Sequence, residues 1–457
     1  MTQDRHTKVA KLQPPPPKVN LLITQYRIRR LIVKSLLKSL STWSLASLLL
    51  AAGCASQATP DNQHRLRDAL HLPGKLTQTQ LGPRPYFLVQ DMDESPLKDK
   101  LASCANGPFF SSDFSIGHRG AALMFPEHTR ESYEAAARMG AGIVECDVTF
   151  TKDRALVCRH SQCDLHTTTN ILETSLAQKC SVAPEFDAQG NLTNAASIQC
   201  CTSDITVAEF KTLQGKMDAA NTSATSIDEY MNATPDWRTD LYASRGTLMT
   251  HQESIELFLQ LGVKFTPELK SPSVPMPYQG DYTQTMYAQQ MIDDYIAAGV
   301  APEKVWPQSF SYDDIVYWVN NTEFGVQGAY LVQDNADATQ AEMQTWYDAG
   351  VRVLAPAMWM LLDVNAEGRI VPSQYALNAR AVGFDLIAWT LERSGPLASG
   401  GGWYYQTLNG SDGGENVINN DGDALVVLDV LAQDVGVIGV FSDWPATTTY
   451  YANCMGL

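Results

Sequence analysis

From about residue 112 onward, short apolar runs alternate with segments in which apolar residues recur at helical spacing. This alternation is typical of a parallel α/β fold. The segment Arg130–Met139, for example, predicts a helix with Thr129 as its N-cap and Gly140 as its stop. Eight apolar runs predict strands near residues 114–118, 142–149, 263–268, 304–309, 327–332, 351–355, 385–390 and 437–442. Eight strand–helix units over this length predict a (β/α)8 barrel, the TIM-barrel α/β fold.

Reactive side chains lie at or just after the ends of these predicted strands. His118 and Arg119 follow the first strand, and the others are Glu145, Asp147, Glu268, Lys270, Trp389 and Asp443. Barrels of this kind carry their chemistry at the carboxyl ends of the strands. The sequence therefore predicts one site at the mouth of the barrel.

A polar turn at residues 151–154 separates the second predicted strand from an apolar run that leads to His160. Side chains alternate along a strand, so Glu145 and Asp147 point to the same face. A tight hairpin centred on this turn would place Glu145 opposite His160 and Asp147 opposite Cys158. That register puts two carboxylates and an imidazole on one face, and a slip of one residue would undo it.

The charge distribution excludes one class of partner. The 457 residues have a formal net charge of −17, although residues 1–53 carry nine Lys and Arg against one acidic residue. The rest of the chain is therefore strongly acidic and offers no broad basic surface to nucleic acid. A local basic pocket for one small phosphate is compatible with this balance.

Residues 1–53 predict a signal peptide. Basic residues precede an apolar run from Leu45 to Gly53, which is shorter than the roughly twenty residues that cross a bilayer. The stretch L-A-A-G-C ending at Cys54 resembles a bacterial lipoprotein box, in which the cysteine is lipidated. The alternative is an ordinary cleaved signal with an incidental cysteine. Lipidation predicts an exported, membrane-anchored lipoprotein, periplasmic or at the cell surface, with residues 54–111 as tether and N-terminal strap.

The eight cysteines besides Cys54 fit an exported protein with disulfides. Cys104 and Cys454 flank the predicted barrel and could join its ends, whereas Cys146 and Cys158 are interpreted as buried thiols. Zinc binding is disfavoured because paired C-x-x-C spacings are missing from the sequence. Four cysteines of one loop-rich segment are expected to pair among themselves: Cys163, Cys180, Cys200 and Cys201.

Roughly a hundred residues separate His160 from the third predicted strand, far more than an ordinary loop contains. We expect residues 161–262 to be largely an inserted lid or subdomain, within a barrel domain at residues 112–452. The turn-rich stretch Asn419–Asp423 could bind Ca²⁺, but it lacks the twelfth-position Glu of an EF-hand loop. A plain loop is the favoured interpretation.

An ordered set of motifs runs through the predicted barrel: H-R-G at 118–120, P-E-H-T at 126–129, E-C-D-V at 145–148, T-K-D at 151–153, His160, P-E-L-K at 267–270, W-T at 389–390 and F-S-D-W-P at 441–445. Together they closely resemble the glycerophosphodiester phosphodiesterase family, in particular its longer, exported members. The resemblance implies a (β/α)8 barrel that hydrolyses small glycerophosphodiesters to sn-glycerol 3-phosphate and an alcohol.

The resemblance also assigns Glu145, Asp147 and Glu268 to a divalent cation. Three converging carboxylates repel one another unless a hard cation neutralises them, and their alternative role is in salt bridges. Export favours Ca²⁺ over Mg²⁺.

The acid–base pair that the resemblance implies is His118 and His160, since imidazole titrates near neutrality. A purely structural role is the alternative for each histidine. Arg119 is expected to hold phosphate oxygens with two parallel hydrogen bonds, and Lys270 to add a point charge.

Glu127 is expected to orient Arg119 or the cation's ligands, or else to cap the following helix. Trp389 is expected to form an apolar wall at the barrel mouth, the alternative being a core position. Three positions depart from the family's pattern: Ser161, His166 and Glu392 stand where Asp, Arg and Asn are usual. They bear on the orientation of His160 and on the preferred leaving group.

Two other functions fit part of the same pattern. One is a related barrel phospholipase or lyase that acts on lysolipids, and the other is a surface lipoprotein that binds a partner on a barrel without activity. The complete set of histidines, carboxylates and basic residues favours the hydrolase.

Overall fold

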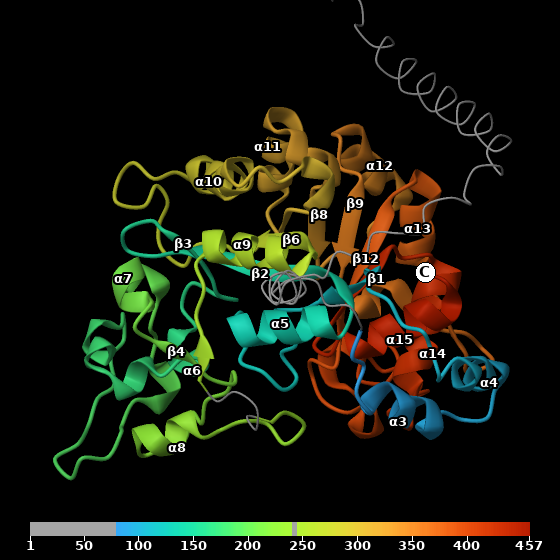
Figure 1. The fold of residues 1–457 in the computed structure, drawn as a ribbon, viewed down its shortest axis with the longest axis horizontal. Coiled ribbons are helices and arrows are strands. Elements are labelled where there is room, and N and C mark those ends of the chain that lie inside the picture. The colour runs from blue at the N-terminus through green and yellow to red at the C-terminus, as the bar shows by residue number, and fades with distance from the viewer. Residues whose placement is uncertain (1–78, 240–244) are drawn as a thin grey trace, which may run out of the picture. The chain divides into compact units, whose positions relative to one another are not determined.

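The computed structural model describes residues 79–239 and 245–457, and its centre is a closed barrel of parallel strands (Figure 1). Because β1 pairs with both β2 and β13, the sheet closes on itself. The barrel strands, in chain order, are β1 (Ser112–Gly117), β2 (Ala141–Phe150), β6 (Lys264–Leu269), β7 (Gln308–Ser309), β8 (Ala329–Val332), β9 (Val353–Pro356), β12 (Asp385–Leu391) and β13 (Gly439–Ser442). Each predicted strand is confirmed.

Helices follow the barrel strands and cover the outside of the sheet (Figure 1). They are α5 (Arg130–Arg138), α9 (His251–Leu261), α10 (Gln284–Ala297), α11 (Tyr312–Asn321), α12 (Gln340–Asp348), α13 (Gln374–Val382), α14 (Asp423–Asp429) and α15 (Ala446–Met455). The first six begin at a Ser or Thr whose hydroxyl accepts a backbone N–H of the first turn. Thr129 caps α5 as predicted, and Gly140 follows its end with a φ of 91°.

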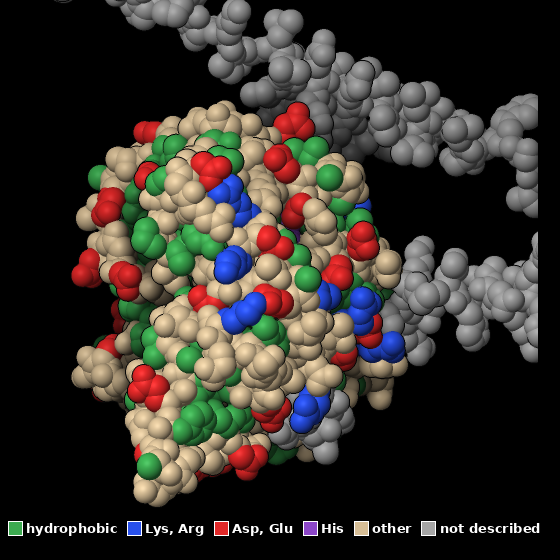
Figure 2. Space-filling view, turned by 90° about the vertical axis from the view of Figure 1, so that its left-hand side faces the viewer, with side chains coloured by type: hydrophobic (Ala, Val, Ile, Leu, Met, Phe, Trp, Pro, Cys, Tyr) green, Lys and Arg blue, Asp and Glu red, His purple; other side chains and the backbone are tan. Residues whose placement is uncertain are grey.

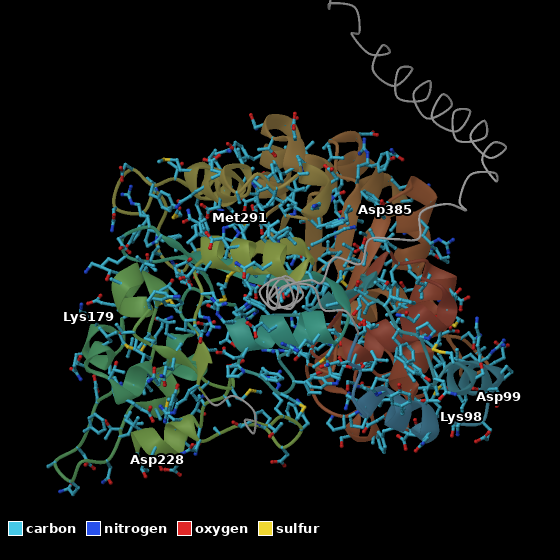
Figure 3. All side chains as sticks on the ribbon, in the orientation of Figure 1. Lys98, Asp99, Lys179, Asp228, Met291 and Asp385 are labelled. Carbon is cyan, nitrogen blue, oxygen red and sulfur yellow. A yellow bond between two sulfur atoms is a disulfide. The ribbon has the colours of Figure 1, made fainter. Side chains whose placement is uncertain are left out.

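Two apolar layers hold the barrel together. Its interior is filled by a cluster that includes Ile116, Ile143, Leu331 and Phe441. A larger cluster packs the outer faces of the strands against the helices, and Met291 on the buried side of α10 belongs to it (Figure 3). Every residue of β2 is buried, as expected for a parallel strand that is covered on both faces.

Short elements surround the barrel. Within the predicted tether and strap at residues 54–111, the structure has two helices, α3 (Arg84–Asp91) and α4 (Pro96–Ser103). A small antiparallel pair, β10 (Leu362–Val364) and β11 (Ile370–Pro372), lies between β9 and α13. No helix within residues 79–239 and 245–457 combines the length and apolarity needed to cross a membrane. The predicted signal peptide and Cys54 lie outside the described residues.

The segment between β3 (Leu156–Cys158) and α9, residues 159–250, forms a compact unit beside the barrel; we call it the inserted segment. Its short elements are α6 (Leu165–Thr168), α7 (Val207–Phe210), α8 (Ile227–Met231), β4 (Gln214–Gly215) and β5 (Gly246–Thr247). It contributes most of a separate hydrophobic cluster. In Figure 3, Lys179 and Asp228 of this segment lie on the side of the molecule opposite Lys98 and Asp99.

Basic side chains on the face drawn in Figure 2 lie among acidic ones. The inserted segment and its surroundings show the same pattern in detail, since Lys179 pairs with Glu209 and Lys211 pairs with Glu253. Such exposed pairs contribute little to stability. These pairs do, however, place an acidic side chain beside each of the two lysines, so the lysines do not form a basic patch.

The predicted register of the β2–β3 hairpin is wrong by one residue. Val148 pairs with Cys158, so Asp147 stands beside Arg159 and not beside Cys158. The cause is a longer turn than a two-residue hairpin, because Arg154 has a φ of 63° and Thr151 N–H bonds to the carbonyl of Ala155. His160 therefore lies beyond the paired part of β3 and reaches the barrel mouth from its edge.

The structure contains four disulfides, Cys104–Cys454, Cys146–Cys158, Cys163–Cys201 and Cys180–Cys200. The two bonds within the inserted segment and the bond that joins the ends of the barrel confirm the predictions. The interpretation of Cys146 and Cys158 as thiols is wrong, because neighbouring strands bring their Cα atoms to 5.3 Å. Disulfides of this number favour an oxidising compartment.

Replacing either Cys104 or Cys454 by Ser should destabilise the fold. The bond closes a loop of 350 residues, and loss of a native disulfide typically costs about 2–5 kcal/mol. We expect Cys104→Ser, Cys454→Ser and the double variant to lower the urea midpoint by the same amount, since any of them removes one bond. Unchanged midpoints, or additive losses in the double variant, would contradict this expectation.

Candidate active site

The carboxyl ends of the barrel strands surround a cavity of about 340 Å³. Its lining combines charged and aromatic side chains. The titratable and charged ones are His118, Arg119, Glu145, His160, Asp218, Glu268, Lys270 and Arg393, and the aromatic ones are Phe310, Trp389, Trp403, Tyr404 and Phe441. The strand-end residues that the sequence analysis singled out are therefore brought to one place.

Three carboxylates lie close together at the cavity. Glu145, Asp147 and Glu268 are almost completely buried, and one oxygen of each lies within 4.8 Å of the others. Glu145 Oε1 accepts a hydrogen bond from Gln308 Nε2 at 2.9 Å, and its Oε2 accepts one from the backbone N–H of Arg119 at 2.9 Å. These contacts hold the Glu145 carboxylate in place in the lining of the cavity.

Burial and mutual repulsion change how these groups ionise. Burial, together with Asp147 and Glu268, raises the pKa of Glu145 well above its usual range. Burial likewise raises the pKa of Glu268 to about 7, although Lys270 opposes the shift. Burial opposes ionisation of Asp147 as well, but Lys270 and His128 outweigh it and hold the pKa of Asp147 well below its usual range. Crowding and burial therefore favour the protonated form of Glu145 and Glu268 and the ionised form of Asp147.

The donor set fits a hard divalent cation. His128 Nε2 lies 2.9 Å from Asp147 Oδ2, while Asp147 Oδ1 is buried and contacts no hydrogen-bond donor among the described residues. A buried, unpartnered carboxylate oxygen is costly, and a bound ion removes that cost. Oxygen ligands without cysteine suit Ca²⁺ or Mg²⁺ rather than zinc.

His118 is held by a buried aspartate. Its Nδ1 lies 2.5 Å from Asp443 Oδ1, and its Nε2 faces the carboxylates, 3.8 Å from Glu145 Oε2. Burial lowers the pKa of His118 to about 4, with Asp443 opposing and Arg119 assisting the shift. Neighbouring arginines keep Asp443 ionised, so its carboxylate accepts a hydrogen bond from Nδ1–H of a neutral His118. The other ring nitrogen, Nε2, is then left as a proton acceptor.

His160 lines the same cavity from the edge of the barrel. Burial, Arg119 and Lys270 hold its pKa well below the usual range. One oxygen each of Glu127 and Asp164 lies within 4.8 Å of a His160 ring nitrogen. The backbone N–H of Ser161 donates to Asp164 Oδ2 at 3.0 Å, which fixes the Asp164 carboxylate close to the ring.

Arg119 occupies a constrained position over the carboxylates. Its backbone has a φ of 55°, in the left-handed region that non-glycine residues seldom adopt. Its Nη1 donates to both oxygens of Glu127, at 3.1 and 3.2 Å, and its Nε lies 3.7 Å from Asp147 Oδ2. Glu127 thus contacts Arg119, whereas the cap of α5 is Thr129. Strain of this kind is maintained only where the surroundings enforce it.

Lys270 completes the basic groups, with its Nζ 2.5 Å from Glu268 Oε1. Opposite it, Trp389 donates its indole N–H to the carbonyl of Ala355 at 2.8 Å, which fixes the ring in the wall of the cavity. Trp403 and Tyr404 pack against Trp389 with ring centroids 5.9 Å away. The aromatic wall is therefore a continuous surface built on β12 and the loop that follows it.

Several residues of the site were missed by sequence reasoning. They are His128 and Gln308 beside the carboxylates, and Arg393 and Asp218 at the rim. Gln308 stands at a strand end, a signal that could have found it, whereas Asp443 was singled out at its strand end without its role behind His118. Arg393 follows the unusual Glu392, whose buried carboxylate accepts hydrogen bonds from Ser442 and Thr447 instead of entering the cavity.

Metal binding by the carboxylates should be measurable and should depend on pH. Since the pKa of Glu268 is about 7, a proton occupies that carboxylate below pH 7 and must leave before a cation can bind. Affinity for Ca²⁺ or Mg²⁺ should therefore rise between about pH 6 and about pH 8, with proton release in calorimetry.

Asp147→Asn should weaken this binding by more than the 10–100-fold that is typical of a lost supporting contact. Asp385→Asn is a matched control, because Asp385 is exposed at the start of β12, away from the carboxyl end (Figure 3). Equal affinities in both variants would locate the cation elsewhere.

The sequence matches the glycerophosphoryl diester phosphodiesterase family over residues 118–447. An extracellular protein of Arthroderma benhamiae is 46% identical over 251 residues, which cover 53% of this chain and 100% of that protein. A glycerophosphodiester phosphodiesterase of Arabidopsis thaliana is 22% identical over 329 residues, which cover 64% of this chain and 82% of that protein. A solved phosphodiesterase from Oleispira antarctica, in complex with the product sn-glycerol-3-phosphate, is 17% identical over 74% of this chain and 95% of that chain, with a TM-score of 0.45.

The family match includes every cavity-lining residue at the strand ends, from His118, which follows β1, to Phe441 of β13. The fold is the closed parallel barrel that the motifs implied. On this match, the chain belongs to the glycerophosphoryl diester phosphodiesterase family.

Proposed function

We propose that the protein hydrolyses glycerophosphodiesters to sn-glycerol 3-phosphate and an alcohol. The observation that supports this most directly is the convergence of two histidines, three carboxylates and two basic side chains on one cavity. A phosphodiester is anionic and resists attack, so its cleavage needs charge neutralisation, a proton acceptor and a proton donor. Each of these requirements has a candidate group at the mouth of this barrel.

Arg119 and Lys270 are proposed to hold the phosphate. Arg119 has a planar guanidinium that can donate to two oxygens at once, and Glu127 orients it from behind with bonds of 3.1 and 3.2 Å. Lys270 approaches from β6 as a point charge and is paired with Glu268 in the absence of substrate. Phosphate oxygens between these two side chains would lie above the carboxylates.

His118 and His160 are proposed to exchange protons with the substrate. One histidine removes the proton of the substrate's glycerol hydroxyl, whose oxygen attacks phosphorus, and the other protonates the departing alcohol. A cyclic phosphate results, and water then opens it by the same transfers in reverse. Asp443 supports His118 in the accepting role, since it holds the Nδ1 proton and leaves Nε2 free.

Glu145, Asp147 and Glu268 are proposed to hold one divalent cation, Ca²⁺ in preference to Mg²⁺. When bound, the ion supplies positive charge to the phosphate and to the attacking oxygen. Without it, burial raises the pKa of Glu145 well above its usual range and that of Glu268 to about 7, which favours the protonated form of both. These carboxyl groups must ionise before they can bind the cation, and the charge of the cation would then suit the site to an anionic substrate.

Trp389 is proposed to shape the part of the cavity that receives the apolar atoms of the substrate. The rings of Phe310 and Trp389 are 5.8 Å apart and perpendicular, so the wall is preformed. The inserted segment, which accounts for most of the predicted insertion at residues 161–262, is proposed to act as a lid or subdomain at the mouth, as it supplies Asp218 to the cavity wall.

The protein is proposed to work outside the cytoplasm. Four disulfides and the extracellular relative support export. A signal peptide at residues 1–53, a lipidated Cys54 that anchors the protein to a membrane, and a tether at residues 54–111 remain part of this proposal. Its substrate would then be a small molecule that reaches the barrel from the exterior.

The test is release of sn-glycerol 3-phosphate from glycerophosphocholine and glycerophosphoethanolamine, with Ca²⁺, Mg²⁺ or chelator. We expect release that the chelator abolishes, and His118→Ala should lower kcat by about 10² to 10⁴, the usual worth of an acid–base group. Because the variant removes a buried partner of Asp443, its thermal midpoint should fall, and kcat is therefore compared at a temperature at which circular dichroism shows both proteins to be folded.

Cleavage of lysolipids in place of glycerophosphodiesters would instead favour a phospholipase or lyase. A folded, cation-loaded protein that releases nothing from either substrate class would leave the non-catalytic binding role as the better account.

A further inference from the structure

The buried aspartate behind His118 depends on a residue from outside the barrel. Asp443 has no exposed side-chain surface, and its Oδ1 is occupied by His118 Nδ1 at 2.5 Å. Its Oδ2 lies 3.4 Å from Arg393 Nη1 and 3.3 Å from Arg238 Nη2. Arg393 comes from the loop after β12, but Arg238 belongs to the inserted segment.

Arg238 is itself firmly placed. Its side chain is 5% exposed, and the same Nη2 donates to the backbone carbonyl of Arg393 at 3.2 Å. The neighbouring Trp237 lies over Gly395, where a Cβ would stand 3.7 Å from the indole ring. Trp237 and Arg238 therefore pack against the loop after β12, whose Arg393 lines the cavity.

The charge balance shows why one arginine does not suffice. Arg393 Nη2 also contacts Glu127 at 2.9 Å and Asp218 at 3.2 Å, so its single charge is shared among three carboxylates. Arg119 supplies a second charge to Glu127. For Asp443, the second guanidinium is that of Arg238, and a buried carboxylate that loses a partner is strongly destabilised.

We propose that Arg238 is a positioning residue for the reaction: it holds Asp443, and Asp443 holds His118 in the orientation that directs Nε2 at the substrate. The inserted segment would then contribute a residue that positions the catalytic groups, in addition to lining the mouth of the barrel. This inference rests on the proposed function for the role of His118, but the contact itself can be observed without any substrate.

The kinetic test compares Arg238→Gln, Arg238→Lys and Arg245→Gln. Arg238→Gln should lower kcat by about 10- to 100-fold, as loss of a supporting contact does, while KM changes by less than about threefold. Arg238→Lys should recover part of kcat, because lysine restores the positive charge but lacks the planar guanidinium that donates two hydrogen bonds at once. Arg245 lies on the same segment with a 60% exposed side chain, so Arg245→Gln should leave kcat unchanged.

A double-variant cycle shows whether Arg238 acts through Asp443. In an Asp443→Asn background, Arg238→Gln should cause little further loss of kcat, since the contact is already broken. Losses that multiply would mean that Arg238 affects catalysis by another route, and would overturn the proposal. So would an Arg238→Gln variant that keeps more than half of the parent's kcat.

Proton NMR tests the contact even if the protein has a different activity. The proton shared by His118 Nδ1 and Asp443 should give a strongly downfield resonance, identified by its absence in His118→Asn. It should move or broaden in Arg238→Gln and persist in Arg245→Gln. An unchanged resonance in Arg238→Gln would overturn the proposal, whereas a lost resonance with no phosphodiesterase activity would leave the contact standing and remove the proposed function.

Discussion

Three carboxylates buried within a few ångströms of one another are the constraint on which the rest of the site depends. Water cannot screen them, so the surrounding residues must either pair with each oxygen or leave it for a cation. Gln308, His128 and the backbone of Arg119 take up some of these oxygens, and the barrel places all three donors within reach. Asp147 Oδ1 has no such donor among the described residues, which makes it the natural point of contact for an ion.

Pairing of buried charges also explains the arrangement of a second group of carboxylates near the cavity. Glu127, Asp218 and Asp443 face three guanidiniums, those of Arg119, Arg238 and Arg393. Arginine suits this task because it stays charged when buried and contacts two or three carboxylates with one planar group. The network spans β1, β12, β13 and the inserted segment, so local charge compensation also ties together parts of the chain that are distant in sequence.

The barrel was predictable from sequence because parallel strands are buried on both faces and read as continuous apolar runs, β2 being the clearest case. Residues at the ends of these runs were predictable for the same reason, as with Glu145 and Lys270. The hairpin register was not predictable, because it depends on a left-handed backbone conformation at Arg154. An arginine at this position gives no sign of that conformation in the sequence. The roles of Asp218 and Arg238 could not be predicted from sequence either, because their approach to the barrel depends on how the inserted segment packs.

The pairing of Cys104 with Cys454 has a topological consequence. Their Cα atoms are 5.7 Å apart although the two positions are separated by 350 in the sequence, so the chain between them, with the barrel and the inserted segment, forms one covalent ring. A single protease cut in any loop of that ring opens it without releasing a fragment. The cut protein would keep its mass until reduction, and positions 104 and 454 lie close enough for a short peptide to join them in a circularly permuted chain.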